Sequence, residues 1–88
     1  MGRVECIAVE GFDLWFNSHD HRPQHFHALR RGEYELRIYF LLCTNEHLDY
    51  EVKWGKPPSA KVLKKLRELA AQNRAALLSE WERKVCQE

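Results

Sequence analysis

Residues 20–27 read Asp20-His21-Arg22-Pro23-Gln24-His25-Phe26-His27, and the expected fold can be built outward from this stretch. It holds three of the five histidines of the 88-residue chain, and its last three residues open an extended, apolar-alternating run. Alternate side chains of a β-strand share a face, so His25 and His27 point one way and Phe26 the other. His21 lies in the polar loop before Pro23 and can fold back over the same face. The stretch therefore predicts a strand starting near His25 that carries a cluster of imidazoles.

A second strand is expected at residues 34–40, joined to the first by a loop containing Gly32. A two-residue turn at Arg31-Gly32 would mix apolar and polar faces, whereas a three-residue loop at 30–32 keeps one face apolar. Gly32 then takes the left-handed conformation that such loops favour. The pairs expected on the apolar face are Phe26 with Leu36 and Ala28 with Tyr34.

The polar face of this hairpin brings the histidines close to charged side chains. In the preferred register His27 lies opposite Glu35, and His25 lies opposite Arg37. His27 therefore gains a carboxylate neighbour.

Alternating apolar residues predict three more strands, at residues 3–9, 12–16 and 47–54. Ser59 is placed to cap a helix that runs from Ala60 to about Val85, with a bend near Gln72-Asn73. The residues expected in the core are Phe12, Leu14, Phe16, Phe26, Leu36, Ile38, Leu63, Leu66, Leu77 and Trp81.

These elements predict a single α+β domain that spans residues 1–88. Four to five antiparallel strands, between about residues 3 and 54, form a meander with one apolar face. One long C-terminal helix, residues 60–85, packs on that face. His25 and His27 are expected on the open face of the sheet, exposed and away from the helix.

Composition favours a globular fold and excludes several classes of protein. Hydrophobic residues make up 44% of the chain, and its net charge of +1 indicates neither a nucleic-acid nor a membrane partner. Cys6, Cys43 and Cys86 are widely spaced, which is typical of reduced thiols in a reducing compartment. The N-terminus lacks the apolar run of a signal peptide, and no stretch approaches the roughly 18 apolar residues of a membrane span. A cytoplasmic protein is expected.

The histidine cluster allows two kinds of catalytic chemistry. His21, His25 and His27 can supply three ligands to a divalent metal such as zinc and leave a fourth position open, with Asp20 as another ligand and Glu35 orienting His27. Without a metal, the same histidines with Glu35 and Asp20 can serve as general acid and base in RNA cleavage. A solvated histidine face, or a histidine that stiffens the loop, is the simpler alternative and stays open.

The predicted helix starts with Lys61, Lys64, Lys65 and Arg67. Positive charge there opposes the helix dipole, so these residues do not stabilise the helix. They favour binding of RNA or of an acidic partner, with an ordinary solvated face as the alternative.

This layout resembles a bacterial family, domain of unknown function 4160. The family pattern is an aromatic strand, an Asp-His-x-Pro-Pro-His-x-His run, a glycine-containing hairpin and a late tryptophan in a terminal helix. The matching residues here are Leu14-Trp15-Phe16, Asp20 to His27, Gly32 and Trp81 after Asn73-Arg74. Gln24 departs from the pattern, because the family usually has a second proline there.

The resemblance implies a fold and a site more than an activity. Genes of this family often neighbour one for a small protein of domain of unknown function 2442, which implies a toxin–antitoxin-type component with a small cognate protein partner and RNA as a further target. The alternative is a metal-dependent hydrolase or metal-binding protein that uses His21, His25 and His27. A third reading is a binding module whose histidines only shape the loop. The sequence leaves open whether the protein is an enzyme.

Overall fold

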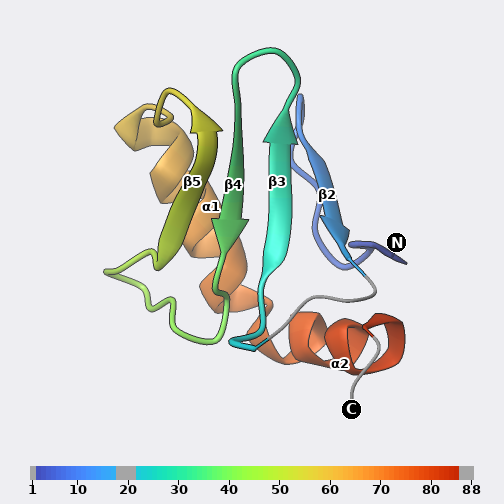
Figure 1. The fold of residues 1–88 in the computed structure, drawn as a ribbon. Coiled ribbons are helices and arrows are strands. Elements are labelled where there is room, and N and C mark those ends of the chain that lie inside the picture. Colours follow the sequence, from blue (N-terminus) through green and yellow to red (C-terminus); the bar gives the residue numbers. More distant parts are fainter. Residues whose placement is uncertain (1, 18–21, 86–88) are drawn as a thin grey trace.

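The computed structural model describes residues 2–17 and 22–85. Five antiparallel strands follow in chain order across one sheet (Figure 1). The strands are β1 (Gly2–Arg3), β2 (Asp13–Phe16), β3 (Phe26–Arg30), β4 (Tyr34–Ile38) and β5 (Tyr50–Gly55), and the helices are α1 (Ala60–Gln72) and α2 (Arg74–Lys84). The predicted α+β class and antiparallel meander are confirmed.

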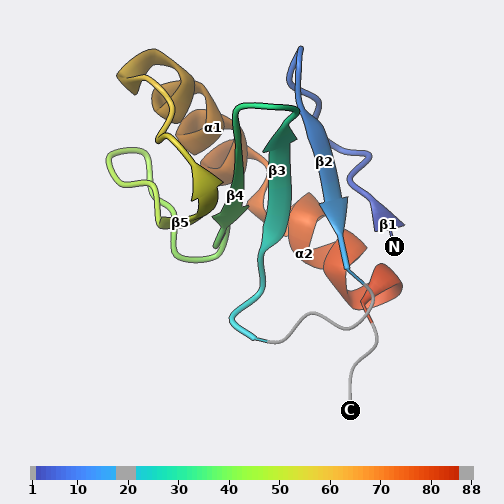
Figure 2. The same ribbon diagram turned by 45° about the horizontal axis from the view of Figure 1, so that its top comes forward.

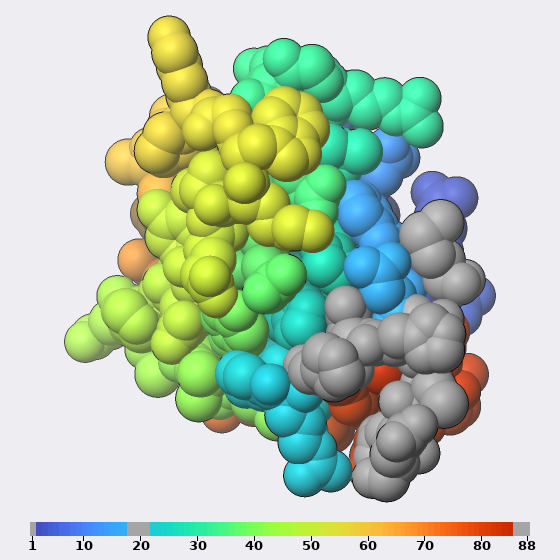
Figure 3. Space-filling model, viewed as in Figure 1, coloured from blue at the N-terminus to red at the C-terminus, as the bar shows by residue number. Residues whose placement is uncertain are grey.

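Both helices lie on the same side of the sheet. In Figures 1 and 2, α1 runs behind β4 and β5, whereas α2 lies at the end of the sheet near β2 and β3. Within the described ranges, neither helix is long and apolar enough to cross a membrane. Neither of the two described helices lies on the opposite face of the sheet, which is the face seen in Figure 3.

The prediction of one long helix is wrong, because the helix is interrupted at Asn73. This residue has φ −115° and ψ 20°, outside the helical region. Its side-chain Nδ2 and its backbone N–H both donate to the Leu69 carbonyl oxygen, at 2.9 and 3.1 Å. Asparagine competes for backbone hydrogen bonds in this way, which explains why the interruption falls where a bend was expected. The predicted cap at Ser59 is present, and its Oγ accepts from the Val62 N–H.

The hairpin register is shifted by two residues from the expected one. Phe26 pairs with Ile38, Ala28 with Leu36 and Arg30 with Tyr34. The loop is therefore residues 31–33, with Gly32 at φ 77° as expected. A shift of two residues leaves every side chain on its predicted face, so the hydrophobic pattern does not distinguish the two registers.

The first strand is much shorter than the predicted residues 3–9. Val4 still donates to the Leu14 carbonyl, but the next two N–H groups, of Glu5 and Cys6, donate to the Glu80 carboxylate at 2.8 Å each. Glu80 lies on α2 and is only 3% exposed. The N-terminal segment therefore leaves the sheet to bind a helix.

The fifth strand begins at Tyr50, later than the predicted residue 47. Thr44 holds a turn there, because its Oγ1 accepts from the N–H groups of Glu46 and His47 and its own N–H donates to the His47 carbonyl. The fourth strand likewise ends at Ile38 rather than residue 40.

The core lies between the sheet and the helices and matches the predicted residues with two exceptions. Phe12 packs on its margin, half-buried, and Leu63 is half-buried and outside the cluster. The helix turns Val62, Leu66 and Ala70 inward, so Leu63 falls at the border of the buried face. The predicted residues that are buried are Leu14, Phe16, Phe26, Leu36, Ile38, Leu66, Leu77 and Trp81.

Candidate functional site

The structure brings three of the predicted site residues together on the face of the sheet opposite α1. His27 comes from β3, Glu35 from β4, and His25 directly precedes β3. The rings of His25 and His27 are 5.1 Å apart and nearly perpendicular. The other two predicted residues, Asp20 and His21, lie outside the described residues.

The expected exposure of these histidines is wrong. His25 is 4% exposed and His27 is 1% exposed. Trp15, opposite His27 on β2, stacks on its ring at 5.1 Å with the planes 17° apart. An aromatic neighbour on the adjacent strand can cover a side chain on a face that no helix covers.

His27 belongs to a hydrogen-bonded chain that fixes its tautomer. The Trp15 Nε1–H can only donate, and it donates to Asn17 Oδ1 at 3.1 Å. The Asn17 amide nitrogen therefore faces His27 Nε2, 3.2 Å away, and donates to it. Nε2 is thus an acceptor, so a neutral His27 carries its proton on Nδ1.

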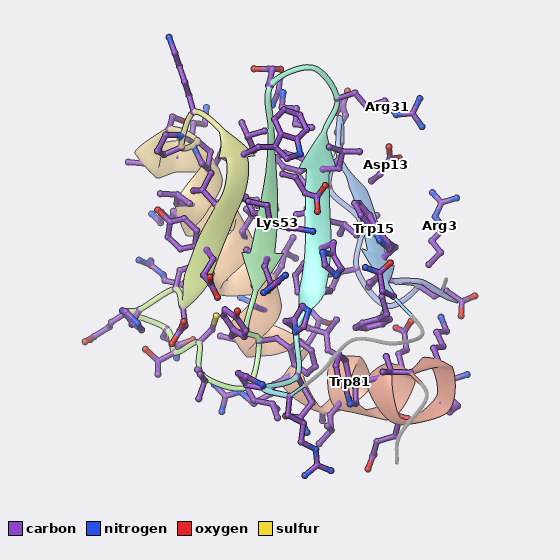
Figure 4. The ribbon with its side chains drawn as sticks, viewed as in Figure 1. Arg3, Asp13, Trp15, Arg31, Lys53 and Trp81 are labelled. Carbon is purple, nitrogen blue, oxygen red and sulfur yellow. The ribbon has the colours of Figure 1, made fainter. Side chains whose placement is uncertain are left out.

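Glu35 connects this chain to β5. Its Oε2 lies 3.5 Å from His27 Nδ1 and 3.2 Å from the Lys53 ammonium. Arg37, and not Glu35, is directly opposite His27, so Glu35 reaches the imidazole diagonally. The predicted carboxylate neighbour of His27 is confirmed, but by a different pairing. Figure 4 shows Trp15 and Lys53 approaching this region from opposite sides of β3.

His25 is buried by the end of α2. Its Nδ1 lies 2.8 Å from the Pro23 carbonyl oxygen, a contact that ties the ring to its own loop. Its ring packs against Tyr39 at 5.5 Å and against Trp81 of α2 at 5.7 Å. Tyr39 in turn donates its hydroxyl hydrogen to Glu51. The expectation of an exposed His25 failed because the break at Asn73 directs α2 across this end of the sheet.

The described contacts involve three of the four ring nitrogens of His25 and His27. Among the described residues no group of three or more His, Cys, Asp or Glu side chains could hold an ion. His27 uses Nε2 for Asn17 and places Nδ1 towards Glu35, and His25 Nδ1 contacts Pro23. The predicted metal site of His21, His25 and His27 therefore depends on His21, which lies outside the described residues.

Sequence reasoning missed Trp15, Asn17, Lys53, Tyr39 and Trp81 as members of this cluster. Trp15 and Asn17 alternate with the buried Leu14 and Phe16, so their place on the histidine face was readable from the second strand. The position of Lys53 could not be predicted from alternation, because an irregularity of the β4–β5 pairing at Glu35/Leu36 brings it beside Glu35.

The lysines at the start of α1 line a separate groove of about 440 Å³. Its lining includes Lys61, Lys64 and Lys65 together with the apolar side chains of Val9 and Phe12. No salt bridge joins these lysines to carboxylates of the described residues. Predicted Arg67 is half-buried and lies outside the groove lining.

The described thiols are not activated nucleophiles. Burial, then the neighbouring Glu80, raises the pKa of Cys6 to about 12. Burial also raises the pKa of Cys43, which is fully buried. Both thiols therefore stay protonated at neutral pH. Cys86 lies outside the described residues.

Residues 11–82 match the family described as Domain of unknown function (DUF4160). The match covers most of the chain, so the protein belongs to this family. No curated protein and no solved structure matched the chain.

Proposed function

We propose that this chain is one component of a toxin–antitoxin-type protein pair and binds a small cognate protein along the outer edge of β5. The observation that carries the proposal is Trp54, which is 46% exposed on that edge strand. Exposed tryptophans are enriched among the residues that dominate protein–protein binding energy. Family membership supports the paired character, because it is the family's gene neighbourhood that implies a partner.

An edge strand offers backbone groups to a second chain. Within residues 2–17 and 22–85, β5 stands last in the sheet and pairs with β4 alone, so its other side has N–H and C=O groups free of pairing with any described strand. Its six residues extend for about 20 Å, enough for one added strand. In Figure 3 the β5 residues form one margin of the visible face, and no other segment lies over them in this view.

The surroundings of β5 favour an acidic partner. A pocket of about 570 Å³ at the end of the strand is lined by Gly55, Lys56 and Arg30, among others. Arg30 also borders the lysine groove of α1, so the two cavities adjoin. Arg30 itself is paired with Glu33 at 2.6 Å, and Glu10 and Glu68 also line the groove. An acidic partner segment that paired with β5 would therefore meet mainly Lys56 and the lysines of the groove.

The buried histidines fit this proposal as residues that fix the sheet face. Their contacts hold Trp15, Asn17 and Glu35 in one arrangement, and Glu35 positions Lys53 on β5. The alternative function, a metal-dependent hydrolase or metal-binding protein, needs a ring nitrogen of His27 to face an ion, and the donation from Asn17 to its Nε2 counts against this. The contact of His25 Nδ1 with the Pro23 carbonyl is compatible with either function, because histidine ligands usually donate their second N–H in this way.

The test is co-expression with the small protein encoded by the adjacent gene, with the tag on that partner. We expect co-elution in size-exclusion chromatography, and slowed growth when one of the two proteins is induced alone. Trp54→Ala should weaken the complex by about 2 kcal/mol, roughly 30-fold in Kd. Leu42→Ala is the matched control, since Leu42 is 50% exposed but lies outside β5.

Two results would refute the proposal. A complex with unchanged affinity in Trp54→Ala would exclude the β5 edge as the docking site. Absence of both co-elution and a growth effect would exclude the paired function.

A further inference from the structure

A pocket of about 330 Å³ lies at the opposite edge of the sheet from β5. Its lining includes Trp15, Asp13 and Arg3, with Leu29 and Arg31 completing the wall from β3 and the hairpin loop. Figure 4 shows Arg31, Asp13, Arg3 and Trp15 together along this edge, apart from Lys53. The volume is at the lower end of the range for small-molecule sites.

Trp15 is a rigid aromatic wall of this pocket. His27 stacks on one face of the indole, and Asn17 accepts the hydrogen bond of its Nε1–H. Both contacts fix the ring: His27 occupies one face of the indole, and the hydrogen bond to Asn17 lies at its edge. Arg3 is paired directly with Trp15 across β1 and β2, so a guanidinium comes from the strand on that other side. A planar ligand can therefore stack on the indole beside a cation.

Asp13 supplies the hydrogen-bond acceptor. It shares a face with Trp15, two positions along β2, and its carboxylate is about half-exposed. Its Oδ2 accepts from Arg31 Nε at 3.0 Å, and this contact orients the group. A carboxylate presents two acceptors in one plane, which match the adjacent N1–H and N2–H₂ donors of guanine. Adenine offers an acceptor at N1 instead, and it would be repelled.

The two arginines give the pocket an excess of one positive charge over Asp13. Arg31 is 84% exposed, so its guanidinium can contact an oxyanion outside the pocket while its Nε stays with Asp13. We therefore propose that this pocket binds a guanine base carrying a phosphate. Trp15 stacks on the base, Asp13 reads its Watson–Crick edge, and Arg3 and Arg31 contact the phosphate. The ligand is a free guanine nucleotide or a guanine in single-stranded RNA, which present the same groups.

Guanine binding at this pocket does not require partner binding at β5, which lies three strands from Asp13. Calorimetric titration of the full chain with GMP and AMP tests it, up to about 5 mM ligand. We expect GMP to bind about tenfold more tightly than AMP, the difference of roughly one hydrogen-bonded contact. Asp13→Asn should abolish this preference. Glu46→Gln, an exposed carboxylate in the 44–47 turn, is the matched control and should preserve it.

A second arm identifies the source of the base. The RNA pentamers UUGUU and UUAUU are titrated beside GMP; tighter binding of UUGUU than of GMP indicates RNA, and the reverse indicates the free nucleotide. Arg31→Gln should weaken GMP binding more than guanosine binding, because guanosine lacks the phosphate that Arg31 contacts. Equal binding of GMP and AMP, a preference retained in Asp13→Asn, or no saturation by any ligand would overturn the proposal. Loss of the β5 complex would not affect this result.

Discussion

Replacing Glu80 by glutamine should test the contact that joins the N-terminal segment to α2. The carboxylate is buried and accepts from the backbone N–H groups of Glu5 and Cys6 and from the Lys84 ammonium at 2.8 Å. Burial by itself raises the pKa of Glu80, but the hydrogen bonds from Cys6, Lys84 and the two N–H groups outweigh it and lower the pKa to about 2. The charged form is therefore part of the folded structure.

The size of this stabilisation follows from the difference between the Glu80 pKa in the folded chain and its ordinary value in the unfolded chain. The ordinary value for a glutamate is 4.5, so the pKa falls by 4.5 − 2, about 2.5 units. At 1.36 kcal/mol per unit, the ionised group stabilises the fold by about 3 kcal/mol at pH 7. Because the folded pKa is the lower one, this contribution is complete above about pH 4.5 and is lost as the pH falls towards 2.

Urea unfolding of wild type, Glu80→Gln and Glu82→Gln at several pH values measures this directly. Glu82 is exposed and lies on the same helix, so its variant should stay within about 0.5 kcal/mol of wild type. We expect Glu80→Gln to lose about 3 kcal/mol at pH 7 and to converge with wild type near pH 2. A difference in unfolding free energy between wild type and Glu80→Gln that does not change with pH would refute the stabilising role of the ionised carboxylate. A loss no larger than that of Glu82→Gln would refute it as well.

Three further experiments probe the sheet and the histidines. Gly55→Ala should cost about 3 kcal/mol or more in chemical unfolding, because φ is 87° and the new Cβ would overlap the Glu33 carbonyl and lie 2.7 Å from Tyr34 Cα. Gly11→Ala, at φ 85° with open space, should cost only about 1 kcal/mol, and equal losses would contradict the clash. His27→Ala should cost about 2–4 kcal/mol, whereas an unchanged melting temperature would restore the exposed-face model. Elemental analysis of tag-free protein should find no stoichiometric metal; zinc present in wild type and lost in His25→Ala/His27→Ala would establish the metal-dependent alternative instead.

The sequence predicted which face of the sheet each side chain occupies better than it predicted the register of the strands. Alternation along residues 26–30 and 34–38 decides which side chains point inward, and all of those assignments hold. The register differs by two residues because such a shift keeps the same parity and the same apolar face. Pairing alone left this choice open, since Phe26 finds an apolar partner at either Leu36 or Ile38.

The burial of the site depended on contacts far apart in sequence. His25 is covered by Trp81 only because the chain turns at Asn73, and a single asparagine in a helical pattern does not specify the new direction. Glu80 and Lys84 read as an ordinary surface pair at i and i+4. Their role in holding Glu5 and Cys6 could not be predicted, because the first residues had an equally good pattern as a strand.

The same contact between residues 5–6 and residue 80 affects how the chain acquires its structure during synthesis. The first segment emerges from the ribosome long before its acceptor on α2 exists. The β2–β3–β4 hairpins, whose contacts are local, can form early, whereas the N–H groups of Glu5 and Cys6 must wait until residue 80 has been synthesised. Until Glu80 has left the exit tunnel, the N-terminal segment is therefore accessible to chaperones and proteases, and its docking is expected to follow the formation of the hairpins.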